Sequence, residues 1–143
     1  MKKVLIPTKL EAVAREILEA HGNYAVVQEV TKEPPALLAL AKAHPDTYAL
    51  IVRSEKITRE IMDLLPGLKV IVRAGAGYDN IDVKYARKRG IDVMNTPGAN
   101  ANAVAEEVIA MMFADARHIV AADSSTRAGK WEKNSFMGND ITG

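Results

Sequence analysis

Two arginines and a pair of closely spaced glycines are the residues of this sequence best suited to chemistry. Arg53 and Arg73 each end a short apolar run, and Gly75 and Gly77 follow directly after the second run. Glycine takes backbone angles closed to other residues, so the amides of residues 74–77 can turn outward and bind an anion. We therefore expect a carboxylate or phosphate beside Arg73. The alternative is a glycine-rich strand-to-helix turn whose arginine is only solvated.

The same glycines begin a pattern that is close to a nucleotide-binding loop. Residues 75–80 start like the dinucleotide fingerprint G-x-G-x-x-G, but Asn80 stands at the sixth position, where the fingerprint needs a glycine for close helix packing. The Gly-Lys-Ser/Thr ending of a Walker loop occurs nowhere in the chain. The sequence therefore predicts neither kind of nucleotide loop.

The composition is that of a small α/β protein. The 143 residues suffice for one ordinary domain and an appendage, and 48% of them are apolar while only 5% are aromatic. The net charge is +1, and no basic stripe interleaved with aromatic residues occurs, so nucleic acid is not an expected partner. The absence of cysteine excludes a disulfide framework and fits a reducing compartment. Since neither a signal-peptide pattern nor a membrane-spanning run is visible, we expect a cytoplasmic protein without membrane contact or a metal site.

Apolar runs and amphipathic segments alternate along the first part of the chain. Strands are expected at residues 3–6, 24–30, 48–52, 69–72 and 91–94, and helices after Thr8 and at 36–43, 58–65 and 83–88. Thr8 and Thr58 are the expected N-caps of the first and third helices. Strands and helices that alternate at this spacing form a parallel sheet through right-handed crossovers, with helices on both faces. Residues 1–97 are therefore predicted to form a five-stranded, doubly wound α/β unit of flavodoxin-like outline.

Polar groups follow three of the expected strands at the place where ligands usually bind. In doubly wound sheets the ligand lies outside the carboxyl ends of the strands. Arg53 and Ser54 follow the third strand, residues 73–77 the fourth, and residues 95–97 (Asn-Thr-Pro) the fifth. We expect these groups to meet at one edge of the sheet. Taken singly, Arg53 is also explained as a surface charge, Ser54 as a turn residue and residues 95–97 as an exit turn.

The pattern changes after residue 97. Residues 98–102 form a small polar linker, and residues 103–122 are predicted to form one long helix that is apolar on nearly every side. A helix of this kind must be buried on more than one face. The remaining residues carry no strand repeats that could cover it. We therefore expect the helix to pack on a partner or on residues outside this chain.

Three motifs together resemble a known enzyme family. They are VIVRAGAGYDNID at residues 70–82, VMNTPGANANAVAE at residues 93–106 and GKW at residues 129–131. They resemble the D-isomer-specific 2-hydroxyacid dehydrogenases over essentially the whole chain, and most closely the members that oxidise D-3-phosphoglycerate. The resemblance implies that residues 1–97 are a substrate-binding domain. Residues 98–143 would then be an interdomain helix and the start of a Rossmann NAD domain that is absent beyond its first helix.

The resemblance also implies roles for individual residues. The substrate's phosphate or carboxylate would be held by Arg53, Ser54 and Arg73, its carboxylate by the amides of Ala74, Gly75 and Gly77, and a further group by Asn100, while Ala76 would approach the nicotinamide of NAD. Asn100 or Asn102 has a second reading as a plain helix N-cap, with Glu106 and Glu107 complementing the helix dipole. The helix at residues 103–122 would form a homodimer.

The catalytic groups of the family align beyond Gly143. These groups are the dinucleotide fingerprint, an arginine, a glutamate and an acid/base histidine, and none of the three histidines of this chain aligns with the last. We expect the full protein to oxidise D-3-phosphoglycerate with NAD, in serine biosynthesis, and this chain alone to be inactive. The alternatives are a dehydrogenase acting on glyoxylate, hydroxypyruvate or D-lactate, and a stand-alone binding module of flavodoxin-like fold.

Overall fold

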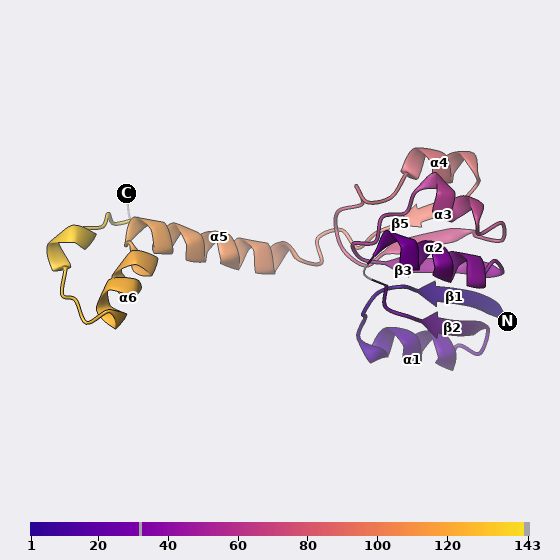
Figure 1. Ribbon diagram of the computed structural model, residues 1–143, viewed down its shortest axis with the longest axis horizontal. Helices are drawn as coiled ribbons and strands as arrows, with labels where there is room; N and C mark the ends of the chain where they lie inside the picture. Colours follow the sequence, from indigo (N-terminus) through magenta and orange to yellow (C-terminus); the bar gives the residue numbers. More distant parts are fainter. Residues whose placement is uncertain (32, 142–143) are drawn as a thin grey trace. The chain divides into compact units, whose positions relative to one another are not determined.

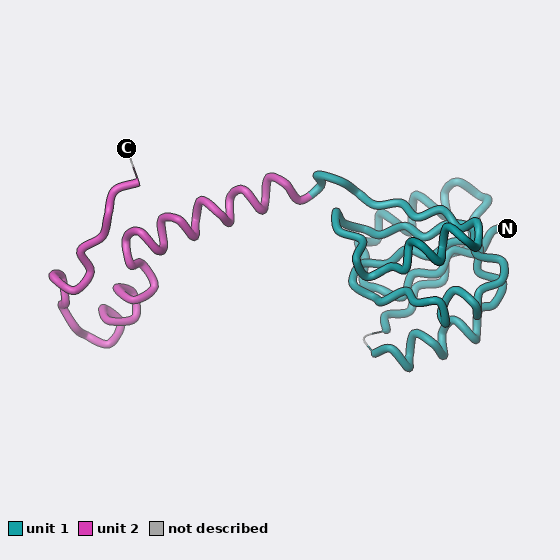
Figure 2. The backbone as a smooth tube through the Cα atoms, turned by 90° about the horizontal axis from the view of Figure 1, so that it is seen from above, with its two compact units in different colours: residues 1–99 teal, residues 100–143 magenta. Residues whose placement is uncertain are grey.

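A computed structural model describes residues 1–31 and 33–141 of the chain. The chain divides into two compact units, Met1–Ala99 and Asn100–Gly143, which Figure 2 shows in different colours. Among the described residues, no helix combines the length and the apolar character that a membrane crossing requires.

The first unit is built on a sheet of five parallel strands (Figure 1). The strands are β1 (Lys2–Ile6), β2 (Tyr24–Gln28), β3 (Thr47–Val52), β4 (Val70–Arg73) and β5 (Asp92–Met94). Their order across the sheet is β2-β1-β3-β4-β5, which is the order of the flavodoxin-like doubly wound fold. The predicted parallel five-stranded sheet is therefore confirmed, with strand ends that differ from the predicted ones by up to two residues.

Four helices connect these strands, but they cover the two faces of the sheet unequally. The helices are α1 (Ala12–Ala20), α2 (Pro34–Ala43), α3 (Arg59–Asp63) and α4 (Val83–Lys88). The crossover through α1 runs toward the β2 edge and the other three run toward the β5 edge, so right-handed connections place α1 on one face and α2, α3 and α4 on the other.

The hydrophobic core lies on the face that carries three helices. Leu50 and Ile71 from the sheet pack there with Leu40, Met62 and other buried residues of α2 to α4 and their loops. No residue of α1 is buried, and Val70 and Val72, which alternate with Ile71 on β4, are only partly buried. The expectation of a sheet covered on both faces is thus wrong for the β3–β5 part of the second face, because α1 crosses only between β1 and β2.

The first helix does not begin at its predicted N-cap, and the predicted N-cap of the third helix makes no side-chain hydrogen bond. Helix α1 begins at Ala12 after Glu11, and Thr8 is instead buried, with its carbonyl accepting a hydrogen bond from Gln28 Nε2 at 3.1 Å. Thr58 does precede α3, but its side chain makes no cap hydrogen bond. The helix with a side-chain cap is α4, where Asp82 Oδ1 accepts from the Tyr85 amide at 2.9 Å. That bond and the Arg59 guanidinium hold the pKa of Asp82 below its ordinary value.

The second unit contains two helices where the sequence predicted one. They are α5 (Ala101–Ala116) and α6 (Ile119–Arg127), followed by the 3-10 helix η1 (Lys133–Phe136). The predicted helix at residues 103–122 is interrupted because His118 adopts a left-handed conformation, with φ 52° and ψ 34°. This turn lets α6 fold back against α5, and the chain returns until the Asn139 amide donates to the Ala116 carbonyl at 2.8 Å.

The second unit buries none of its helical residues. Its exposed apolar side chains include Val104, Val108, Ile109, Met111, Met112, Phe113, Ile119 and Val120, which are between 45% and 76% exposed. Apolar surface of this extent is unusual for an isolated soluble chain.

Candidate functional site

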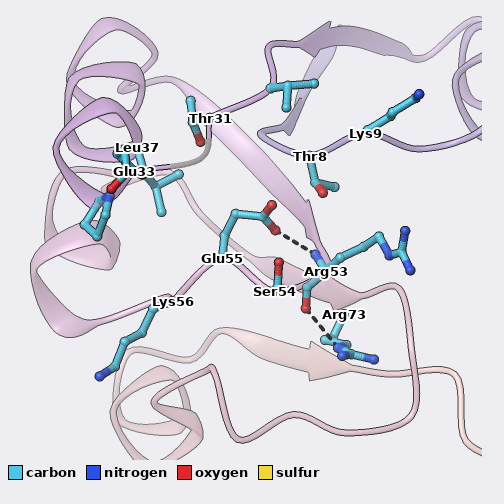
Figure 3. Close-up of a pocket in the computed structure, with 12 residues that line it drawn as sticks. Thr8, Lys9, Thr31, Glu33, Leu37, Arg53, Ser54, Glu55, Lys56 and Arg73 are labelled. Carbon is cyan, nitrogen blue, oxygen red and sulfur yellow. Dashed lines mark hydrogen bonds between the residues drawn. The ribbon is translucent and has the colours of Figure 1, made fainter.

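A pocket of about 520 Å³ lies at the carboxyl ends of strands β1 to β4 (Figure 3). The loops that follow β1, β2 and β3 contribute to its lining, together with Arg73 at the end of β4. Arg53, Ser54 and Arg73 are all among the lining residues, so the structure brings these three predicted site residues together. This is the edge at which doubly wound sheets bind their ligands.

The two arginines are placed by the pairing of neighbouring strands. Val52 on β3 is in register with Arg73 on β4, so Arg53, the next residue along β3, leaves the sheet beside Arg73. The Arg73 Nε donates a hydrogen bond to the Arg53 carbonyl at 3.0 Å (Figure 3). The guanidinium group of Arg73 is thereby fixed against the loop that carries Arg53. Two cationic side chains are held at one rim, as an anionic ligand requires.

Gly75 is required by the position of the Arg73 side chain. A Cβ atom built on Gly75 would lie 1.5 Å from Arg73 Nη1 and 2.5 Å from Arg73 Cζ. Any larger residue at position 75 must therefore displace the guanidinium group. The first glycine of the motif makes room for the arginine, a role that its spacing alone did not indicate.

The amides of residues 74–77 are only partly available to a ligand. The Ala74 amide donates to the Val52 carbonyl at 2.7 Å, extending the β3–β4 pairing, and the Gly75 amide turns back to the Arg73 carbonyl at 2.8 Å. Among the described residues, the amides of Ala76 and Gly77 have no acceptor. The expectation that all four amides turn outward is therefore wrong for the first two, since the sheet and a tight turn use them.

The residues that follow β5 hold the glycine loop in place. Asn95 Nδ2 donates to the Ala76 carbonyl at 2.7 Å, and the Thr96 amide donates to the Gly75 carbonyl at 3.0 Å. The predicted meeting of residues 73–77 with residues 95–97 at one edge is thus observed. The Gly75 and Ala76 carbonyls are thus bound by the residues after β5, while the Ala76 and Gly77 amides remain available to another partner.

Several pocket residues were not found from the sequence. Lys9 follows β1, Thr31 and Glu33 follow β2, and Glu55 and Lys56 follow Ser54 in the loop after β3. Arg53 was predicted because it follows the carboxyl end of a strand, where ligands of doubly wound sheets bind. The same criterion, applied to the first two strands, would also have found Lys9 and Thr31. Glu55 Oε2 accepts a hydrogen bond from the Arg53 amide at 2.8 Å.

The lining carries more positive than negative charge. Four basic side chains (Lys9, Arg53, Lys56 and Arg73) and two acidic ones (Glu33 and Glu55) contribute to it. Lys9, Arg53 and Arg73 come from three different strand ends and extend toward the same side of the view in Figure 3. A surplus of cations in a concave site concentrates anions there. The pocket is therefore suited to a small acid.

Asn100 belongs to the second unit. It occupies the N-cap position of α5 without a side-chain cap hydrogen bond, and its carbonyl accepts from the Val104 amide at 3.0 Å. Asn102 lies inside α5, where its Nδ2 donates to Glu106 Oε1 at 2.9 Å. Asn100 therefore stands at the N-cap position, as its second reading predicted, although neither asparagine makes a side-chain cap hydrogen bond.

The loop after β4 does not form a pyrophosphate-binding site of the dinucleotide type. The loop after β4 leads into a turn that ends at Asn80, and its first two amides and two of its carbonyls are bound inside the protein. A pyrophosphate normally sits on free amides at a helix N-terminus that directly follows the first strand. The loop therefore lacks the arrangement that binds the pyrophosphate of a dinucleotide.

Comparison with known proteins gives consistent matches. Residues 4–137 match the family described as "D-isomer specific 2-hydroxyacid dehydrogenase, catalytic domain". Hydroxypyruvate reductase from Thermotoga maritima is 47% identical over 116 residues, which are 80% of this chain and 38% of that protein. D-3-phosphoglycerate dehydrogenase from Methanocaldococcus jannaschii is 40% identical over 144 residues, which span 100% of this chain and 26% of that protein.

A solved structure with bound NAD+ is also similar. It is 3-phosphoglycerate dehydrogenase from Entamoeba histolytica, with a TM-score of 0.69 and 39% sequence identity, over 81% of this chain and 39% of that one. The chain therefore spans between 26% and 39% of the length of these relatives.

The fit of Arg73 over Gly75 predicts the effect of a minimal substitution. Gly75→Ala should weaken the binding of inorganic phosphate about tenfold, because the new methyl group displaces a charged hydrogen-bond donor from the pocket. Phosphate titrations followed by NMR measure this change. Gly67→Ala is the matched control, since its Cβ would meet only the Thr47 carbonyl at 3.5 Å. Unchanged phosphate binding by folded Gly75→Ala would contradict the role of Gly75.

Proposed function

The chain belongs to the D-isomer specific 2-hydroxyacid dehydrogenase family, and we propose that it is the substrate-binding part of an NAD-dependent enzyme that oxidises D-3-phosphoglycerate to 3-phosphohydroxypyruvate, a step of serine biosynthesis. The observation that carries this proposal is the arginine pair at the rim of a pocket with a surplus of positive charge. Relatives with the name D-3-phosphoglycerate dehydrogenase that align over the whole chain support it.

The proposed roles follow from the chemistry of the pocket residues. Arg53 and Arg73 bind the phosphate or carboxylate of the acid, since a guanidinium group offers two parallel N–H donors to such groups. The Ser54 hydroxyl donates a further hydrogen bond. In the glycine loop, the Ala76 and Gly77 amides bind the carboxylate, while Ala74 and Gly75 contribute shape rather than their amides.

Two roles rest on the family resemblance alone. Asn100 would hydrogen-bond the substrate, and Ala76 would also lie beside the nicotinamide of NAD. A threonine is common in the family at the position of Ala76, and its hydroxyl is missing here. NAD, when bound, supplies the hydride acceptor, and the share of this chain is to hold and orient the acid.

The first alternative is a reductase for hydroxypyruvate, which lacks the phosphate. It is favoured by the hydroxypyruvate reductase of Thermotoga maritima, which shows 47% identity. The four basic side chains of the pocket favour the phosphorylated acid, because a phosphate adds charge for them to neutralise. The two candidates therefore differ in whether the pocket requires a phosphate.

Calorimetric titration of the chain with D-3-phosphoglycerate and with D-glycerate tests the proposal. The phosphorylated acid should bind about tenfold more tightly, and Arg53→Ala and Arg73→Ala should each abolish most of this difference, because each removes a charge-assisted contact. Equal affinity for both acids would support hydroxypyruvate as the substrate of the full protein. Binding of neither acid would contradict both dehydrogenase readings and support a stand-alone binding module.

The chain by itself should not catalyse the oxidation. None of its three histidines lines the pocket, and the loop after β4 lacks the pyrophosphate-binding arrangement of a dinucleotide site, so we expect neither a histidine base nor a firmly bound hydride acceptor beside the acid. The absorbance of NADH in a mixture of chain, NAD and D-3-phosphoglycerate measures this. NADH formation above a blank without protein would refute the prediction.

We further propose a homodimer formed through residues 103–122, which comprise most of α5 and the start of α6. Exposed apolar side chains on this segment are the support for it. Light scattering should show a dimer of the chain, and Met112→Glu together with Phe113→Glu should give a monomer, because two charges would then be buried at the contact. Val13→Glu, at an exposed apolar residue of α1, is the control that should remain dimeric. A monomeric wild-type chain would rule this contact out.

A further inference from the structure

We propose that Asn80 is a positioning residue for the arginine pair. Its side-chain amide holds the loop between β3 and α3 in the shape that orients Arg53 and Arg73 toward the ligand. The inference rests on the proposed function of the pocket as an acid-binding site. It assigns a role to the residue that distinguishes the glycine motif of this chain from a dinucleotide fingerprint.

Asn80 contacts the β3–α3 loop at three points. Its Nδ2 donates to the Glu55 carbonyl at 2.8 Å and to the Arg53 carbonyl at 3.3 Å. Its main-chain carbonyl accepts a hydrogen bond from the Ile57 amide at 2.8 Å. The contacts fall on alternate residues, from the first residue after β3 almost to the start of α3. One residue therefore fixes the course of the whole loop that carries Arg53 and Ser54.

The Arg53 carbonyl links Asn80 to the second arginine. This oxygen accepts from Asn80 Nδ2 and also from Arg73 Nε, at 3.3 Å and 3.0 Å. The Arg73 guanidinium donates its Nε–H to this oxygen. No described residue accepts a hydrogen bond from its two terminal nitrogens. The direction of those nitrogens is thus set by the carbonyl, and the position of the carbonyl is set in part by Asn80.

The chemistry of the contact explains why an asparagine stands at this position. A side-chain amide carries two N–H donors on one nitrogen, so it can bridge two carbonyl oxygens of the same loop. An aspartate would face both carbonyls with acceptors only, and a glycine, as in the dinucleotide fingerprint, would offer no donor. Residue 80, at the sixth position of the motif, therefore shapes the β3–α3 loop in this chain, whereas the glycine of the fingerprint allows close packing of a helix.

The test is calorimetric titration of the 143-residue chain with D-3-phosphoglycerate, for the wild type, Asn80→Ala and Asn80→Ser. Asn80→Ala should weaken binding about tenfold, because the charge-assisted contacts of both arginines lose their geometry. Asn80→Ser keeps one donor on a shorter side chain and should recover part of this loss. Arg59→Ala is the matched control. Arg59 Nε pairs with Asp82 Oδ2 at 3.1 Å, which joins the start of α3 to the N-cap of α4 without contacting Arg53.

The outcomes separate positioning from general stability. Loss of affinity in the Asn80 variants with unchanged affinity in Arg59→Ala supports the proposal. Wild-type affinity in a folded Asn80 variant, or an equal loss in Arg59→Ala, overturns it. Failure of the wild-type chain to bind the acid contradicts the proposed function instead.

NMR of the wild-type chain provides a test that needs no variant. The side-chain amide signals of Asn80 and the Nε–H signal of Arg73 share one acceptor, so both should shift during the titration and saturate at the same acid concentration. An Arg73 signal that shifts while the Asn80 amide signals stay fixed would overturn the proposal.

Discussion

The main-chain carbonyl of Arg53 is the point on which the candidate site depends. It is the first carbonyl beyond the pairing of β3 with β4, so the sheet no longer determines its direction. Arg73 and Asn80 both donate to it, and the Arg53 amide is bound by the Glu55 carboxylate. Both polar groups of one peptide stretch are thus used by neighbours from two loops. These hydrogen bonds hold the end of β3 in place beside the two guanidinium groups.

Both units of the chain leave apolar side chains exposed or only partly buried. The first unit completes its core on the face covered by α2, α3 and α4, whereas β4 leaves Val70 and Val72 only partly buried on the other face. The second unit exposes apolar side chains along both of its helices. Buried apolar area drives folding and association. Each unit therefore retains apolar surface that its own residues do not cover.

Most of the fold was predictable because strands and helices differ in local pattern. The apolar run before Arg73 indicated β4 directly, and the position of ligands at the carboxyl ends of strands predicted that Arg53 and Arg73 meet at one edge. The break at His118 was not predictable, because no glycine or proline stands between Ala116 and Ile119. The hydrogen bonds of Asn80 and Asn95 were not predictable either, since they join loops that lie far apart in the sequence. The same holds for the Ala74 amide, whose acceptor is the distant Val52 carbonyl.

The requirement for arginine at position 73 follows from the number of its donors. A lysine carries its three donors on one nitrogen at the end of a flexible stem, so it cannot hold the Arg53 carbonyl with one nitrogen while presenting others in a fixed plane. The guanidinium group holds the carbonyl with Nε and keeps its terminal nitrogens in the same plane for another acceptor. This plane lies where a side chain on residue 75 would otherwise stand, so glycine is the residue that fits beside it. Gly75 therefore makes room for Arg73, and Arg73 shares the Arg53 carbonyl with Asn80.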